Sequence, residues 1–143
     1  MILDSKQEFF DATNVYANSS AAVYSTDSTP SLYVDFGPLY KSMVSGIGMK
    51  LYIKMTTAAT GAGGCLMNFV LQTDDNAAFS SPTTIAQTGA TAVATFALGY
   101  EVLLPDIPSH KMERYCRLGV LTTVANGATG ACDACLLIDK QTN

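Results

Sequence analysis

The stretch IGMKLYIKMT, residues 47–56, alternates between apolar side chains and polar or small ones. One face of this stretch carries five apolar side chains: Ile47, Met49, Leu51, Ile53 and Met55. The other face carries a glycine, two lysines, a tyrosine and a threonine. A period of two is typical of a β-strand with one buried side and one wet side. The stretch therefore predicts a half-buried strand of an antiparallel sheet.

The same alternation continues further along the chain. It recurs in CLMNFVLQT (65–73), RYCRLGVLTTV (114–124) and ACDACLLID (131–139). The small residues TTAATGAGG between the first two runs predict a hairpin with a long, mobile tip. The turn sequence ANGATG predicts a second hairpin between the last two runs.

Weaker patterns predict five more strands, separated by turns rich in glycine, proline and asparagine: Ala12–Ser25, Ser31–Phe36, Thr83–Thr88, Thr91–Ala97 and Tyr100–Leu104. Pro105 and Pro108 are expected to end the last of these, because proline cannot donate to a ladder. About eight short strands favour an all-β, antiparallel sandwich or barrel, with a jelly roll as a natural candidate. No repeat or linker is evident, so we expect one β-sandwich domain over residues 13–143, preceded by an N-terminal arm or short element over residues 1–12.

Charge and hydropathy exclude several classes of function. The net charge is −4, and the eight lysines and arginines form no basic stripe, which argues against nucleic-acid binding. No apolar run approaches the roughly 20 residues of a membrane span, and the acidic N-terminus does not resemble a signal peptide. We therefore expect a protein made in a cytoplasm, where its four cysteines remain free thiols.

Charged residues make up only 14% of the chain, against about 25% in a typical soluble protein. Such a surface is either rich in uncharged polar residues, as in many β-proteins, or largely covered by partners in an assembly. We favour coverage by partners.

The residues that could carry chemistry do not form a complete site. Cys132 and Cys135 form one CxxC, but a zinc site needs further ligands, and positions three apart on a strand face opposite sides. His110 is the one histidine and lies in a polar loop without a nucleophile signature. Gly61–Cys65 lacks the lysine and helix of a phosphate-binding loop. We expect no catalytic residue, metal or cofactor.

The acidic pair Asp74 and Asp75 poses the same question. A calcium loop requires alternating acids, a glycine and a later glutamate, and TDDNAAFSSP has adjacent acids without either. Aspartate and asparagine readily bond their own backbone in turns. We therefore expect Asp74 and Asp75 to turn the chain, with Phe79 and Pro82 fixing its path to the next strand.

Several stretches, in order and over nearly the full length, resemble one family: MILD, FFDA, LQTDDNAAFSSPTTI, VLLP, ERYCRLGV and ACLLID. The chain is similar to the small capsid cement, or decoration, proteins of tailed bacteriophages, of the type found on a short-tailed Bordetella phage. The resemblance implies a jelly-roll-like sandwich on the outer surface of an HK97-type capsid in the virion. It implies partners in the major capsid protein and in other copies of the chain, often as a homodimer, and no catalytic residues.

The chain departs from the family pattern between Thr13 and Ser45 and in its cysteines. Candidate contacts with the capsid or with another subunit lie in the N-terminal arm and in the acidic loop: Ile2, Leu3, Phe9, Phe10, Asp74, Asp75 and Phe79. Exposed apolar residues on an arm require a cover, which is either a partner or the chain's own sandwich.

Two other functions remain open from the residues. The first is a carbohydrate-binding or adhesin module, using tyrosine platforms at Tyr16, Tyr24, Tyr33 and Tyr40. The second is a small hydrolase or a cupin-like metal enzyme, although cupins need several histidines and this chain has one.

Overall fold

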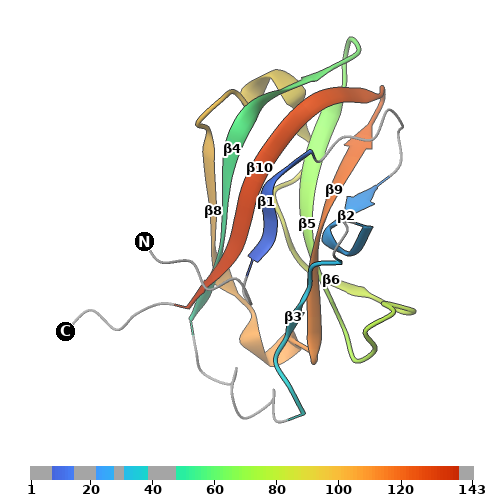
Figure 1. Cartoon of the computed structure of the whole chain (residues 1–143), viewed down its shortest axis with the longest axis vertical. Helices are drawn as coiled ribbons and strands as arrows, with labels where there is room; N and C mark the ends of the chain where they lie inside the picture. The colour runs from blue at the N-terminus through green and yellow to red at the C-terminus, as the bar shows by residue number, and fades with distance from the viewer. Residues whose placement is uncertain (1–7, 15–21, 28–30, 39–47, 139–143) are drawn as a thin grey trace, which may run out of the picture.

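A computed structural model describes residues 8–14, 22–27, 31–38 and 48–138 (Figure 1). One sheet has the order β1 (Glu8–Asn14), β10 (Gly127–Ile138), β4 (Met49–Gly61), β8 (Glu101–Ile107). The second has the order β2 (Val23–Tyr24), β9 (Tyr115–Thr123), β5 (Leu66–Asp74), β6 (Thr83–Gln87), with β3 (Val34–Asp35) also on β9 and β7 (Thr91–Ala92) also on β5. Short 3-10 turns occur at η2 (Ser25–Asp27), η3 (Val93–Thr95) and η4 (Ser109–Lys111). Within these ranges no helix has the length and apolar character to cross a membrane.

The strand pairing is that of a jelly roll. If β2 with β3, and β6 with β7, each count as one strand, the chain has eight strands in sequence order. The first then pairs with the eighth, the second with the seventh, the third with the sixth and the fourth with the fifth, all antiparallel. A long hairpin rolled into two sheets has this pairing. The predicted all-β sandwich, jelly-roll-like with about eight strands, is confirmed.

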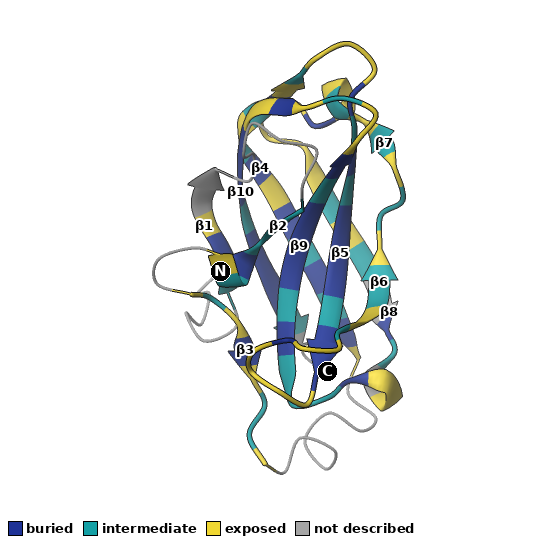
Figure 2. Cartoon of the chain, turned by 90° about the vertical axis from the view of Figure 1, so that its right-hand side faces the viewer, coloured by how far each residue is buried: buried dark blue, intermediate teal, exposed yellow. Residues whose placement is uncertain are grey.

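The core lies between the two sheets, as Figure 2 shows by the dark inner stripes of the strands. The described part of the opening stretch is β4, whose residues alternate as predicted: Met49, Leu51, Ile53 and Met55 are almost fully buried. Facing them from the second sheet are Met67, Phe69, Leu71, Leu118 and Val120, among others. Period-two alternation therefore identified the core-facing positions of the central strands correctly.

Both predicted hairpins are wrong. β4 pairs with β10 and β8, whereas β5 pairs with β9 and β6, so the turn after β4 crosses from one sheet to the other. The turn between β9 and β10 makes the same crossing. A strand with one apolar face can bury that face from either sheet, so alternation does not show which sheet it joins. The true hairpin is β5–β6, which encloses the acidic loop.

The predicted mobile tip after β4 is also wrong, because β4 continues to Gly61. Its last residues pair with the first residues of β10, with Thr60 opposite Thr129 and Gly61 opposite Gly127. Only Ala62–Gly64 remain as a turn, held by the Ala62 N–H that donates to the Asn126 carbonyl at 3.0 Å. Gly61 is required here, because a Cβ at this position would lie 2.8 Å from the Cβ of Cys65.

Pro105 does not end β8, contrary to the prediction. β8 lies at the edge of its sheet, where a missing N–H breaks no interior ladder. The register changes from Leu51 opposite Leu104 to Met49 opposite Ile107, so β8 has one extra residue at this point. The proline thus lies in a bulge of an edge strand, one of the positions that tolerate it.

The N-terminal part differs most from the prediction. Residues 12–25 do not form one strand: β1 ends at Asn14 and β2 begins at Val23 in the other sheet. The predicted strand over Thr91–Ala97 is likewise divided, into β7 and the turn η3. Only Val34–Asp35 of the predicted strand Ser31–Phe36 is extended, whereas the strand over Thr83–Thr88 is confirmed as β6.

Candidate interaction surface

The acidic loop between β5 and β6 is built around the carboxylate of Asp74. This side chain is 1% exposed and accepts hydrogen bonds from the backbone N–H groups of Asn76 (2.9 Å) and Ser81 (2.8 Å). Burial alone raises the pKa of Asp74, but these N–H donors outweigh it and hold the pKa below its usual value. The side chain of Asn76 repeats the pattern by accepting from the N–H of Ala78. Asp74 therefore shapes the turn, as predicted, and Asp75 is left exposed.

Phe79 anchors this loop on the outer face of the second sheet. Its backbone has φ +50°, a left-handed conformation that is rare for a bulky residue. Its ring is 94% buried and covers one side of the Arg117 guanidinium, whose carbon lies 4.5 Å from the ring centroid. The ring of Tyr24 covers the same guanidinium at 3.9 Å. Strain of this size persists only where the surroundings enforce it, and here the arginine and the Asp74 bonds do so.

Arg117 thus links three separate parts of the chain. Its guanidinium contacts the rings of both Tyr24 and Phe79, and its Nε donates to Gln72 Oε1 at 3.0 Å. Gly119, two residues further along β9, leaves the space that the ring of Tyr24 fills, because a Cβ at Gly119 would lie 2.6 Å from that ring. The stack joins β2, β9 and the acidic loop into one surface.

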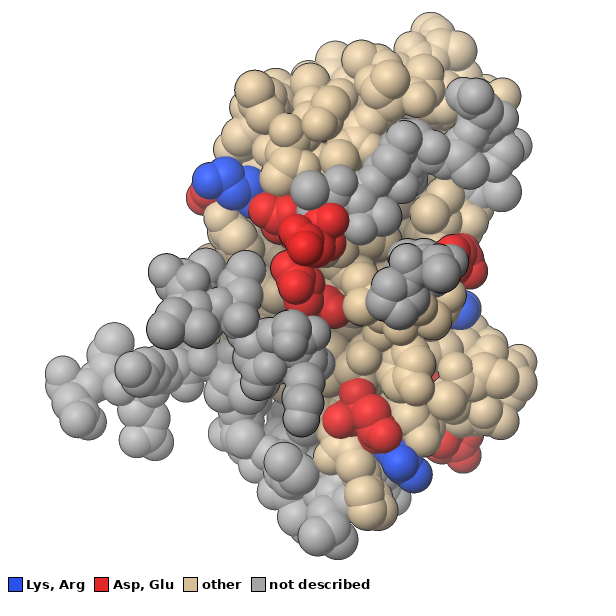
Figure 3. Space-filling view, in the orientation of Figure 1, with Lys and Arg blue, Asp and Glu red and all other residues tan. Residues whose placement is uncertain are grey.

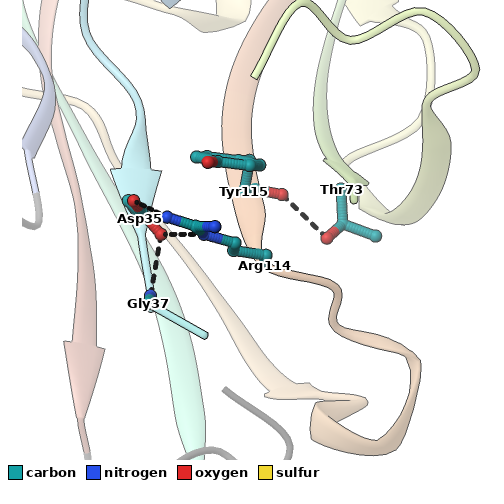
Figure 4. Close-up of polar contacts among 5 residues, drawn as sticks. All are labelled: Asp35, Gly37, Thr73, Arg114 and Tyr115. Carbon is teal, nitrogen blue, oxygen red and sulfur yellow. Dashed lines mark hydrogen bonds and ion pairs between the residues drawn. The ribbon is translucent and has the colours of Figure 1, made fainter. Parts of the chain in front are cut away.

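A second arginine extends this surface (Figure 4). The Arg114 guanidinium donates two hydrogen bonds to the carboxylate of Asp35, at 2.9 and 3.1 Å, and lies over the ring of Tyr115. The hydrogen bond from Arg114 lowers the pKa of Asp35. Tyr33 contacts Tyr115 and Phe79 edge-on. Below them, the buried hydroxyl of Thr73 donates to the Tyr115 carbonyl at 2.9 Å and ties β5 to the start of β9.

The two arginines differ in burial, which predicts different effects of substitution. Arg117→Met keeps the length of the side chain but loses two cation–ring contacts and two hydrogen bonds, to Gln72 and Thr26. We therefore expect a loss of about 1–2 kcal/mol in unfolding free energy. Arg114→Met breaks a solvent-exposed pair and should lose clearly less unfolding free energy than Arg117→Met does. Urea unfolding of both variants tests this, and a larger loss in Arg114→Met would contradict the structural role of Arg117.

The structure places most of the described candidate contacts in the interior. Phe9 and Phe10 are fully buried in the core, and Asp74 and Phe79 are buried in the acidic loop. The rings of Phe9 and Phe10 both reach the core because β1 has a bulge there, with Glu8 opposite Cys135 and Phe10 opposite Ala134. Of the described candidates only Asp75 is exposed, while Ile2 and Leu3 lie outside the described residues.

The cysteines and the histidine do not converge. Cys132 faces the core, whereas Cys135 lies three residues on, outside the core cluster, and faces the other side of β10. Burial raises the pKa of the Cys132 thiol, and burial together with nearby Glu8 raises the pKa of Cys135 to about 11. His110 is exposed in η4. Among the described residues no group of three or more His, Cys, Asp or Glu side chains is placed to hold a metal ion.

A family comparison adds to this geometry. The model of the Bbp16 family matches residues 17–136, which is most of the chain. The chain belongs to the Bbp16 family. The family is named for a Bordetella phage protein, so membership supports the phage connection implied by the sequence motifs. A search of curated proteins finds no match.

Apart from Tyr33, which the sequence offered as a sugar platform, the exposed large apolar residues of this Bbp16-family chain were not among the sequence candidates. Five large hydrophobic side chains are exposed among the described residues: Tyr33, Leu98, Tyr100, Leu103 and Val124. Leu98 and Val124 are the most open, at 71% and 77%. One sequence signal could have located most of them, because Leu98, Tyr100 and Val124 lie in long runs without any charged residue.

Proposed function

We propose that this Bbp16-family chain is a capsid cement, or decoration, protein of a tailed phage. It binds the outer surface of an HK97-type capsid and stabilises the shell by bridging major capsid subunits. It is made in the host cytoplasm, becomes part of the virion and associates with other copies of itself. It catalyses no reaction and binds neither nucleic acid nor membrane.

The observation that carries this proposal is the charge-poor surface. Only 14% of the residues are charged, and five large apolar side chains are exposed among the described residues. Interface cores are depleted in charge and enriched in aromatic side chains. The accessible surface is 7557 Å², so one standard interface of roughly 800 Å² per partner would cover about a tenth of it. Contacts with several neighbours explain such a surface better than a free monomer does.

A cement protein stabilises its partner by mass action. A protein that binds the assembled shell, and not the separated subunits, shifts the equilibrium toward assembly by an amount set by its affinity and concentration. This role requires a rigid body with contact surfaces and no reactive site. The sandwich, with its acidic loop fixed by Asp74 and Arg117, provides such a body.

The carbohydrate-binding alternative receives less support from the tyrosines. A sugar platform needs an open aromatic face, but Arg117 covers a face of Tyr24 and Arg114 lies over Tyr115. Tyr33 is 39% exposed but is held edge-on between two other rings. Tyr16 and Tyr40 lie outside the described residues.

Binding to shells and shell strength together test the proposal. Purified protein is mixed with phage shells assembled without it, and the shells are sedimented and then heated. We expect saturable cosedimentation and a higher rupture temperature of the decorated shells, because dissociation of a subunit must also break its contacts with the bound protein. Shells that neither retain the protein nor gain resistance to heat would refute the proposal.

A further inference from the structure

Among the residues that the structure describes, one end of the sandwich contains no charged side chain. Three segments meet there: residues 55–68, 88–100 and 121–132, none of which includes Asp, Glu, Lys, Arg or His. Strand pairing brings them together, since Gly61 lies opposite Gly127 and Leu66 lies opposite both Thr123 and Ala92. In Figure 3 the described atoms at the top of the molecule are tan, with neither blue nor red among them. We call it the charge-free end.

The exposed residues of the charge-free end are small or apolar. Apart from Leu98, Tyr100, Val124 and Asn126, they are all alanine, glycine or threonine. Alanine and glycine lose almost no side-chain entropy on burial, and no charge has to be removed from water. A partner can therefore cover this end with little loss of side-chain entropy at the alanines and glycines and with no charge of this end to desolvate.

Val124 is the most exposed of the described large apolar residues on this surface. It lies in the turn between β9 and β10, is 77% exposed and has φ +72°. A β-branched residue is an outlier in this left-handed conformation, which asparagine or glycine adopts more easily. Its neighbour across the end is the β4–β5 turn, where a Cβ at Gly64 would lie 3.6 Å from the Val124 side chain. The fold thus presents an apolar side chain to solvent in a strained conformation that a polar residue would relieve.

The charged groups lie on the rest of the molecule. Glu8, Asp11 and Asp133 gather on the outer face of the first sheet, where burial and the two neighbouring carboxylates raise the pKa of Glu8. The acidic loop and the Arg114–Asp35 pair lie toward the opposite end. A molecule that binds a surface through its charge-free end would therefore expose its acidic groups to the medium. Repulsion between these negative charges would keep decorated particles apart.

We infer that the charge-free end is the surface that docks on the phage shell, an inference that rests on the proposed cement function. The matching patch on the shell must itself be uncharged, because a charge facing this end would be buried without a partner. The contact then depends little on salt, since no charges pair across it. If two copies paired through this end, the surface would be buried in the dimer and neither copy could use it to bind the shell.

A matched pair of substitutions at one residue tests the inference. Asparagine and aspartate both accept the left-handed backbone of Val124 better than valine does, so both variants should fold. Val124→Asn adds no charge and should bind shells within about threefold of the wild type. Val124→Asp buries an unpaired charge and should weaken binding by at least about tenfold. Leu98→Asp is a second charge insertion at the same end with the same expectation.

Ala77→Asp is the control, because Ala77 is exposed on the acidic loop away from the charge-free end. It should bind shells as the wild type does, and wild-type binding should change little between about 0.05 and about 0.5 M salt. If the wild type binds shells and both Val124→Asp and Leu98→Asp bind equally well, the docking surface is wrong but the proposed cement function stands. Absence of wild-type binding would refute the proposed function. A wild-type dimer in light scattering that Val124→Asp converts to monomer would assign this end to a second copy and overturn docking on the shell.

Discussion

Phe10→Ala should remove about 3–5 kcal/mol of unfolding free energy, a large part of what a domain of this size possesses. The ring is fully buried at the bulge of β1, opposite Ala134 of β10, and its removal leaves a cavity between the sheets. Leu103→Ala is the matched control, because Leu103 is 51% exposed on β8, at the other edge of the same sheet. It should change stability by less than about 1 kcal/mol. Denaturant unfolding of both variants measures the difference.

Deletion of residues 1–12 should prevent cooperative folding, because it removes most of β1 together with Phe9 and Phe10. This outcome separates two interpretations of the N-terminus. If Phe9 and Phe10 were exposed contacts on an arm, the shortened chain would fold and only lose its partner. A folded, cooperatively melting deletion variant, or a Phe10→Ala variant as stable as Leu103→Ala, would contradict the packing described above.

Asp74→Asn should destabilise the protein by about 1.5–3 kcal/mol, because two backbone N–H groups lose a charged acceptor in a buried site. The amide nitrogen cannot accept, so one of the two N–H groups is left without an acceptor. Asp75→Asn, at the exposed neighbouring position, should change stability by less than about 0.5 kcal/mol. Equal effects of the two substitutions would contradict the structural role of Asp74.

The same carboxylate predicts a dependence of stability on pH. The pKa of Asp74 in the folded protein lies below the ordinary value of 3.8. A depressed pKa means that the stabilisation is complete well above that value and is lost as the pH falls through the folded-state pKa. The wild type should therefore lose stability between about pH 5 and pH 2, and its curve should converge with that of Asp74→Asn at the acidic end. Parallel curves over this range would show that Asp74 makes no such contribution.

Much of the fold could be predicted from the alternation of side chains. The alternation in residues 49–55 and 67–71 identified the core-facing residues, because a sheet with one buried face imposes a period of two. The assignment of strands to sheets could not be predicted this way. β4 and β5 are joined by a short turn and both have an apolar face, so a hairpin and a crossing between sheets look alike in sequence.

The candidate surface was harder to predict. The role of Asp74 followed from the local chemistry of aspartate in turns, because its partners are at most seven residues away. The stack of Tyr24, Arg117 and Phe79 joins residues far apart in the sequence, and no local pattern connects them. The sequence left open whether a partner or the chain's own sandwich covers Phe9 and Phe10, because a bulge lets two adjacent residues reach the same core and alternation cannot reveal a bulge.

Cryo-EM of shells reconstituted with this protein would show where and how it binds. We predict a two-sheet body outside the shell that touches neighbouring capsid subunits through the β4–β5 and β9–β10 turns, with the acidic face of β1 and β10 in the medium. A map in which the shell has no added density, or in which the acidic loop or the β1–β10 face lies against the capsid, would contradict this prediction.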